Sequence, residues 1–267
     1  MIVRLLSRYY KSKLRGSFRA TRLINKFYPL NDIHVQTPYG TVNVDLTIAS
    51  GQALACFEPT SEGDIIAKHA KGICYDIGAH FGIYSVLMKR NNADVFAFEP
   101  NPKIFSHLEK TGQINDFKCF NVALSDFNGA ADFFVPEEAT MGSLTNWTRD
   151  EDMYGITKYA GDVSQTRVEV ATLDRFVKEN NLPLPDFIKI DVEGAEINIF
   201  KGGRNTIESA RPVIFFEVSA TLWEKQGSTH TEGFEFFDSL GYHLYLGDKK
   251  LSNLNLEWDN VLAIPVI

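Results

Sequence analysis

Short apolar runs alternate with amphipathic stretches through most of the chain. The runs have the length and the Val, Ile and Phe content of buried strands, and they read GICYDI, DVFAFE, FKCFNVAL, DFIKID and RPVIFFEV, over residues 72–77, 94–99, 117–124, 186–191 and 211–218. Between and after them, the pattern predicts helices near residues 82–90, 101–115, 172–180, 193–203 and 231–240. Strands that are apolar along their whole length are typical of a parallel sheet with helices on both faces.

The pattern departs from this alternation at three places. Residues 33–46 alternate around Pro38 and Gly40, which predicts an N-terminal hairpin. Residues 128–170 have β-rich ends around a polar and aromatic stretch, which predicts a hairpin that encloses a long loop. Two apolar runs near the end, 242–247 and 260–267, have a polar link and predict an antiparallel hairpin at one edge of the sheet. The expected α/β fold is a Rossmann-like, mostly parallel sheet of seven strands.

These patterns divide the chain into an arm and one domain. We expect an arm over residues 1–32 and a domain over residues 33–267, with a hairpin region at 33–56 and an insertion loop, a candidate lid, at 136–165. The chain of 267 residues is long enough for one large α/β domain.

Charge is distributed unevenly along the chain. The net charge is −7, which disfavours general nucleic-acid binding. Eight basic residues and no acidic residue precede Asp32, and apolar residues are interspersed among them. Two interpretations of residues 1–30 stay open: an amphipathic helix on an anionic membrane surface, or a helix that packs on the acidic body or on a second subunit in a homodimer.

The cysteines and the start of the chain bear on the compartment. Cys56, Cys74 and Cys119 lack CxxC spacing, as is typical of reduced packing thiols. Basic residues interrupt the apolar stretch after Met1, so no secretory signal is expected, and nothing resembles a membrane-spanning helix. We therefore predict a cytoplasmic protein, or one that is peripheral at the inner face of a membrane.

The sequence DIGAHFG, residues 76–82, stands where a ligand would bind in such a sheet. Gly78 can adopt a positive φ, Gly82 permits close packing at a helix start, and Asp76 is expected to face the crevice. Glu99 ends the next strand, where a carboxylate can accept hydrogen bonds from a ribose diol. The loop lacks GxGxxG, a P-loop and nearby basic residues, so S-adenosylmethionine fits better than a phosphate-bearing ligand.

Several motifs resemble one family in order and content. YDIGAHFGIYS, FAFEPNP, NVALSD, TLDRF, FIKIDVEGAEINIFKGG and FFEV resemble the FkbM-type methyltransferase family over about residues 57–265, and IKIDVEGAE is the most specific block. The resemblance implies a class I, S-adenosylmethionine-dependent enzyme, typically an O-methyltransferase of sugars or natural-product hydroxyls. This chain has His80 where the family usually has Asn, so the contact there with the methionine part of the cofactor, or with substrate, is expected to differ.

The resemblance also implies a set of cofactor-binding residues. Asp76, Gly78, Ala79 and Gly82 would line the methionine end, with His80 beside them; Glu99 would hold the ribose; Ala123 and Leu124 would lie near the adenine; and Asp191 would lie next to the reactive methyl group.

Transfer of a methyl group to a hydroxyl requires removal of a proton. Asp191 and Glu193 are the leading candidates, with Glu217 after them, and His80 and His243 as alternative bases. Glu193 could instead cap its helix, and Glu217 could bind a substrate hydroxyl without proton transfer. Glu196 is expected to pair with Lys201 or to face solvent.

Two further features of the candidate site stay open. Asp191, Glu193 and Glu217 could supply oxygen ligands to a divalent metal ion, but their spacing is not a metal signature, so a metal is not favoured. Met141, Ser143, Trp147, Tyr154, Tyr159 and Trp223 are candidates for a substrate lid and its aromatic faces, or for core packing under the loop.

The expected function is methyl transfer from S-adenosylmethionine to a hydroxyl of a sugar, glycan or glycolipid. The alternatives are a methyltransferase that acts on a polyketide hydroxyl or an amine, and a non-catalytic module with a degenerate methyltransferase fold.

Overall fold

A computed structural model describes residues 24–136, 142–144 and 163–266. Residues 1–23 of the basic arm, and most of the candidate lid, lie outside the described residues. The predictions of a membrane contact or a dimer contact through the arm therefore stay predictions. Within the described residues, every helix is too short or too polar to cross a bilayer.

The central sheet confirms the predicted Rossmann-like arrangement of mostly parallel strands. Its strand order is β12-β11-β13-β10-β9-β3-β4-β5 in the described residues. The parallel strands are β3 (Ile73–Ile77), β4 (Asp94–Phe98), β5 (Lys118–Phe120), β9 (Phe187–Ile190) and β10 (Val213–Ser219). The antiparallel edge consists of β13 (Trp258–Pro265), β11 (Tyr242–Leu246) and the two-residue β12 (Lys249–Lys250). The predicted edge hairpin is thus present, with β12 as an additional short strand.

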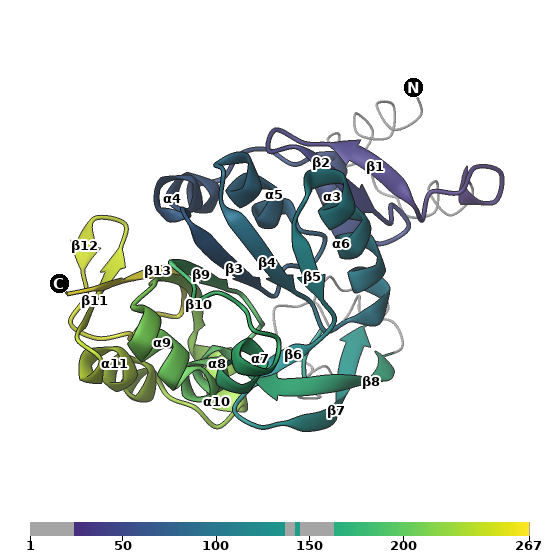
Figure 1. Cartoon of the computed structure of the whole chain (residues 1–267). Helices are drawn as coiled ribbons and strands as arrows, with labels where there is room; N and C mark the ends of the chain where they lie inside the picture. Colours follow the sequence, from purple (N-terminus) through teal and green to yellow (C-terminus); the bar gives the residue numbers. More distant parts are fainter. Residues whose placement is uncertain (1–23, 137–141, 145–162, 267) are drawn as a thin grey trace.

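Helices cover both faces of this sheet, because side chains of its strands alternate between two cores (Figure 1). Tyr75 and Ile77 belong to one core and Cys74 to the other. The first core packs against α7 (Leu173–Glu179), α8 (Glu196–Gly202), α9 (Arg204–Ala210), α10 (Ala220–Lys225) and α11 (His230–Ser239). On the other face lie α4 (Ser61–His69), α5 (Ile83–Arg90) and α6 (Pro102–Asn115).

Side-chain caps fix several helix starts. Thr60, Asn101 and Thr172 accept hydrogen bonds from backbone N–H groups in the first turns of α4, α6 and α7, and such caps contribute about 1 kcal/mol each. The cap by Thr172 lies at the start of the helix predicted near residues 172–180. Helices α4, α9 and α10 were not predicted, and α8 begins at Glu196 instead of residue 193, because Glu193 and Gly194 both have positive φ.

The predicted third strand over residues 117–124 is two strands. Asn121 donates from Nδ2 to the carbonyl oxygens of Glu99 (2.8 Å) and Pro100 (3.0 Å), and this contact ends β5. The chain then enters β6 (Ala123–Ser125), in a second sheet with β8 (Val163–Thr172) and β7 (Gly129–Pro136). Strands β7 and β8 pair antiparallel, as the predicted hairpin requires.

The N-terminal part of the described chain packs on the main domain. Strands β1 (Ile33–Gln36) and β2 (Thr41–Val44) pair antiparallel, and α3 (Ala49–Ala55) follows. Asn43 anchors the hairpin to α6, since its N–H donates to Thr111 Oγ1 (2.9 Å) and its Oδ1 contacts His107 Nδ1 (2.6 Å). This packing places α3 beside the site described below.

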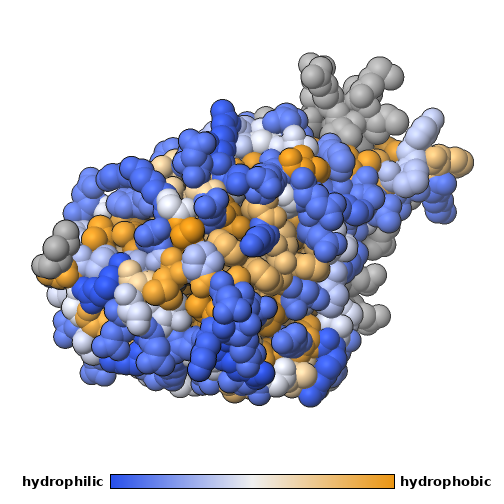
Figure 2. All heavy atoms as spheres, in the orientation of Figure 1, coloured by the Kyte–Doolittle hydropathy of each residue, from blue (hydrophilic) through white to orange (hydrophobic). Residues whose placement is uncertain are grey.

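The surface in the orientation of Figure 1 is mixed in character. Figure 2 shows hydrophilic residues over most of its margin and hydrophobic residues gathered in the middle, over the central sheet. Phe27 and Tyr28 are 75% and 58% exposed, in the part of the basic arm that the structure describes.

Candidate active site

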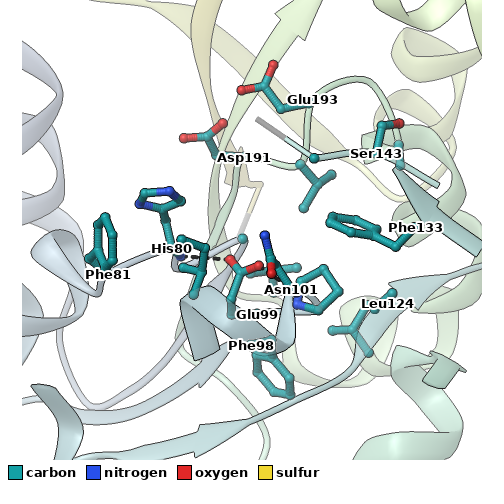
Figure 3. A pocket seen from close by; sticks show the side chains of 18 of the residues that line it. His80, Phe81, Phe98, Glu99, Asn101, Leu124, Phe133, Ser143, Asp191 and Glu193 are labelled. Atoms are coloured by element: carbon teal, nitrogen blue, oxygen red, sulfur yellow. Dashed lines mark hydrogen bonds between the residues drawn. The ribbon is translucent and has the colours of Figure 1, made fainter. Parts of the chain in front are cut away.

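A cavity of about 360 Å³ lies at the carboxyl ends of β3, β4 and β9. The strand order reverses between β3 and β9, and ligands of open α/β sheets bind at such a switch point. The volume is in the range of small-molecule sites. In Figure 3, Glu99 and Leu124 lie at the bottom of the view, Asp191 and Glu193 at the top, and His80 and Phe133 on the two sides.

The glycines of residues 76–82 let this loop pack closely against the loop at Asp191 and against α6. Gly78 has φ +78°, and a Cβ there would lie 1.9 Å from the carbonyl oxygen of Asp191. Gly82 has φ +86°, and a Cβ there would lie 2.8 Å from Leu108 Cδ1 on α6. The predicted positive φ of Gly78 and the close packing at Gly82 are both confirmed. The immediate reason for Gly78, however, is the approach of the Asp191 backbone.

Glu99 is a buried carboxylate with backbone partners. Its Oε2 accepts from the N–H of His80 (3.0 Å), and its Oε1 accepts from the N–H of Asn101 (2.8 Å). Burial raises the pKa of Glu99 to about 7, although these two N–H groups oppose the rise. Each carboxylate oxygen has a second lone pair, so Glu99 can accept two further hydrogen bonds from a diol.

His80 lines the cavity and has φ +52°. This left-handed conformation is uncommon outside glycine and costs energy, and here it accompanies the N–H bond to Glu99. His80 therefore supports the site through its backbone as well as its ring.

Asp76 was predicted to face the cavity, but its side chain lies outside the cavity lining. It lies inside β3, one residue before the strand ends, is fully buried, and is not among the described residues that line the cavity. Its side chain points to the face of α5, where Oδ2 accepts from Ser85 Oγ (2.5 Å) and Oδ1 lies 3.4 Å from Lys189 Nζ. Asp76 is instead connected to the cavity through Lys189, which also pairs with Asp191 in the cavity wall.

Lys189 was missed by the sequence analysis. It is 4% exposed in β9, and its Nζ lies 3.3 Å from Asp191 Oδ2 as well as near Asp76. Burial lowers the pKa of Lys189, but the charges of Asp191 and Asp76 outweigh it and hold the pKa above its ordinary value. A lysine inside the otherwise apolar run FIKI was the available signal, because buried charges are paired.

Glu193 is a cavity residue and not a helix cap. Its φ is +57°, and its Oε2 is buried without a hydrogen-bond partner among the described residues. Burial raises the pKa of Glu193 well above its ordinary value, and the charges of Asp191 and Glu217 raise it further. A carboxyl group with this environment is a candidate proton acceptor.

Glu196, the first residue of α8, holds the turn that precedes the helix. Its Oε1 accepts from the N–H groups of Val192 (3.1 Å) and Gly194 (3.2 Å), and its Oε2 accepts from Trp223 Nε1 (2.7 Å). The prediction that Glu196 pairs with Lys201 or faces solvent is wrong, since Lys201 pairs with Glu232. Trp223 is fully buried, so it packs in the core and does not offer a face to substrate.

Glu217 lies beside the cavity, although it is not among the described residues that line it. It is two residues before the end of β10, is 8% exposed, and accepts from Trp258 Nε1 through Oε1 (2.7 Å). Burial raises the pKa of Glu217 to about 8, and the charge of Asp191 contributes to the rise. His243 lies in β11 opposite Ile264 and is also outside the cavity lining, which disfavours it as a base.

The remaining lining residues give the cavity an apolar side. Ala123 and Leu124 line it as predicted for an adenine, together with Phe98, Val122 and Phe133. Ala79 and Gly82 are not among the described lining residues. Of the candidate lid residues in the insertion loop, Ser143 lines the cavity, and Met141, Trp147, Tyr154 and Tyr159 lie outside the described residues.

Ser50 on α3 was also missed. It lines the cavity, and its Oγ is buried without a hydrogen-bond partner among the described residues. The sequence offered no signal for it, because α3 itself was not predicted. In the part of the chain that the structure describes, no three His, Cys, Asp or Glu side chains are grouped to hold a metal ion.

The sequence is similar to those of known methyltransferases. The sequence profile of the methyltransferase FkbM domain matches residues 76–244. The chain is 30% identical over 164 residues to the 2-O-methyltransferase NoeI of Sinorhizobium fredii, which covers 58% of this chain and 66% of NoeI. It is 25% identical over 142 residues to the hexuronic acid methyltransferase AglP of Haloferax volcanii. That alignment covers 53% of this chain and 54% of AglP.

The chain thus aligns with between half and two thirds of the length of these two relatives. Among solved structures, the methyltransferase FkbM from Methylobacillus flagellatus is 15% identical, with a TM-score of 0.45. The match covers 86% of this chain and 55% of that one. Because the family profile matches more than half of the chain, this protein is a methyltransferase of the FkbM family.

Proposed function

We propose that this protein transfers a methyl group from S-adenosylmethionine to a hydroxyl of a sugar, glycan or glycolipid. One observation carries the proposal: a single cavity has a buried carboxylate suited to a diol, Glu99, and two further acids, Asp191 and Glu193. The printed names of NoeI and AglP describe a 2-O-methyltransferase and a hexuronic acid methyltransferase, which supports a sugar-like acceptor.

The described residues fit the cofactor in three respects. Glu99 has two carboxylate lone pairs left for the ribose hydroxyls. The apolar side of the cavity, with Phe98, Leu124 and Phe133, suits a purine. Asp191 supplies negative charge where an ammonium and a sulfonium would need it.

When bound, S-adenosylmethionine would supply an electrophilic methyl group on a sulfonium, for in-line displacement by the acceptor oxygen. In this proposal Asp191 is a fixed charge, because Lys189 holds it in an ion pair. Glu193 is the general base, because its Oε2 has no other hydrogen-bond partner among the described residues. The hydroxyl proton moves to Glu193 Oε2 as the oxygen forms its bond to carbon.

The raised pKa of Glu193 sets a condition on this role. A proton acceptor must be ionised, and burial together with the charges of Asp191 and Glu217 opposes ionisation of Glu193. A cation that enters the site lowers the pKa of a neighbouring acid. We therefore expect uptake of the cofactor to favour the ionised form of Glu193.

Calorimetry and a labelled methyl donor test the proposal together. Titration with S-adenosylmethionine should give saturable binding. Incubation with the labelled donor should then label a glycan or glycoside from an acceptor panel that also contains polyketide alcohols and amines. Absence of binding at millimolar donor would overturn the cofactor, and label on polyketides or amines alone would overturn the acceptor class.

A further inference from the structure

A polar layer crosses four neighbouring strands at their ends next to the cavity. Asp76 in β3 pairs in register with Lys189 in β9, and Lys189 pairs with Phe215 in β10, two residues before Glu217. Glu217 in turn pairs with Asn260 in β13. Because side chains alternate along a strand, Asp76, Lys189, Glu217 and Asn260 share one face of the sheet.

Helices α4 and α5 close this layer with polar groups. Tyr84 donates to Glu62 Oε2 (2.5 Å), and Asn260 Nδ2 donates to Glu62 Oε1 (3.0 Å). Lys189 Nζ lies 5.5 Å from the centre of the Tyr84 ring. The contacts therefore run without interruption from Asp191, in the cavity wall, through Lys189 to the groups around Glu217.

Trp258 is a partly exposed residue that a hydrogen bond connects to this layer. Its side chain is 45% exposed, and its Nε1 donates to the buried Oε1 of Glu217 at 2.7 Å. An exposed indole forgoes the stabilisation that burial of its large apolar surface would give. The bond to a buried carboxylate orients the ring, and the exposed part of the residue can pack against the apolar C–H face of a sugar ring.

The second oxygen of Glu217 gives this surface a polar contact. Oε2 is buried and has no hydrogen-bond partner among the described residues, and the residue is 8% exposed. A buried polar atom without a partner costs free energy, and a hydroxyl donor from a ligand removes that cost.

This surface adjoins the groups proposed for methyl transfer. Phe216 pairs in register with Ile190, so the next residues of the two strands, Glu217 and Asp191, are neighbours. The charge of Asp191 raises the pKa of Glu217, and the charge of Glu217 raises the pKa of Glu193. A sugar held at Trp258 and Glu217 would therefore lie within reach of Glu193.

We infer that Trp258 and Glu217 form the acceptor subsite, which binds an uncharged pyranose by its C–H face and by one hydroxyl that is not methylated. This inference rests on the proposed function for the role of the bound sugar. The preference for a ligand without a carboxylate follows from charge. Lys189 is already paired with Asp76 and Asp191. The carboxylate of a uronic acid would meet the charge of Asp191 and would further oppose ionisation of Glu193 and Glu217.

Fluorescence of the full-length protein tests the subsite without methyl transfer. The probes are methyl glucoside, methyl mannoside and methyl glucuronide. A neutral glycoside that covers Trp258 should shift the emission of the parent protein and leave that of Trp258→Phe unchanged, while methyl glucuronide at the same concentration should give a smaller shift. Equal shifts in parent and variant, a preference for glucuronide, or no shift with either neutral glycoside at high millimolar concentration would each overturn the subsite.

Kinetics separate the subsite from the proposed function. With an active acceptor glycan, Trp258→Ala should raise the KM for the acceptor about tenfold or more, which corresponds to the loss of one good contact, and should leave the affinity for S-adenosylmethionine within about twofold of the parent. The acceptor KM of Trp258→Phe, which keeps an aromatic face, should lie between that of the parent and that of Trp258→Ala. An unchanged acceptor KM in Trp258→Ala would overturn the subsite and leave the methyltransferase proposal intact, whereas absence of cofactor binding in the parent would overturn the latter.

Discussion

Two sides of the cavity use buried carboxylates in different ways. On the β4 side, both oxygens of Glu99 accept backbone N–H groups. On the β9 and β10 side, Glu193 and Glu217 each have a buried Oε2 without a hydrogen-bond partner among the described residues. Burial raises the pKa of all three carboxyl groups, but to about 7 for Glu99, to about 8 for Glu217 and well above the ordinary value for Glu193.

The difference follows from hydrogen bonding and charge. Backbone N–H groups stabilise the ionised form of Glu99, whereas Glu193 and Glu217 are neighbours of Asp191 and of each other, so their ionised forms repel. A carboxylate of the first kind is suited to hold a ligand. A carboxyl of the second kind is suited to exchange a proton, because its protonation state responds to charges that enter the site.

The largest effect is expected from Glu193→Gln. This change removes the proton acceptor and keeps the size of the side chain, so kcat should fall by about 10²–10⁴, while the affinity for S-adenosylmethionine changes little. Initial rates with a labelled donor give kcat, and calorimetry gives the affinity. Glu232→Gln is the matched control on the surface, where Glu232 pairs with Lys201. A kcat in Glu193→Gln close to that of the control would show that Glu193 is not the base.

Lys189 pairs with Asp76 and with Asp191, and its removal should have the next largest effect. Lys189→Met leaves Asp76 and Asp191 near each other without a cation, and loss of one partner of a buried ion pair costs about 3–5 kcal/mol. Urea unfolding should show this loss in the free energy of unfolding, and Lys178→Met, at an exposed position on α7, should show about 0.5 kcal/mol or less.

A second change checks the cause of that loss. Asp76→Asn in the Lys189→Met background removes one of the uncompensated charges, so it should restore part of the stability. If the double variant is no more stable than Lys189→Met, the electrostatic explanation fails and the loss reflects packing alone.

The sequence was most informative where one pattern had one structural solution. Continuous apolar runs predicted the parallel strands, and the glycines of DIGAHFG predicted the backbone turn, because few other conformations satisfy those residues. Glu99 could be placed as well, since an acid directly after a strand lies at the ligand-binding edge.

The orientation of acids within strands was not predictable in the same way. Asp76 was expected to face the cavity, but the pleat turns it towards Ser85 and Lys189. Glu196 was expected to pair with Lys201 or to face solvent. Because Glu193 and Gly194 have positive φ, α8 begins at Glu196, and its carboxylate bonds the preceding turn and Trp223 instead. Both errors arise from partners distant in sequence, such as Lys189 and Trp223, which a local pattern does not contain.

Glu99→Gln should have an intermediate effect on the other side of the cavity. A glutamine presents an amide N–H₂ to the N–H of His80 or of Asn101, so one backbone bond is lost and one acceptor for the diol becomes a donor. The affinity for S-adenosylmethionine should fall by about 10–100-fold, as expected for a loss of about 1.4–2.8 kcal/mol, while kcat at saturation changes little.

Calorimetry measures this change, and Glu109→Gln, at an exposed position on α6, is its control. A variant that binds the cofactor as tightly as the control would remove the ribose assignment from Glu99. A fall in kcat without a fall in affinity would also contradict the division of roles between the two sides.

The last expected effect is a pH dependence of stability that differs between the two sides. A carboxyl whose pKa is raised in the folded state stabilises the fold below its unfolded pKa of 4.5, and this contribution is lost as pH rises through the folded pKa. The free energy of unfolding should therefore fall between about pH 5 and pH 8, by at most about 1.4 kcal/mol per pH unit for each group. Glu99→Gln should remove the part of this fall in the free energy of unfolding that ends near pH 7. Glu217→Gln should remove the part that continues to about pH 8. Urea unfolding across this range measures both, and variants that run parallel to the parent would show that the two carboxyl groups do not differ in the folded protein.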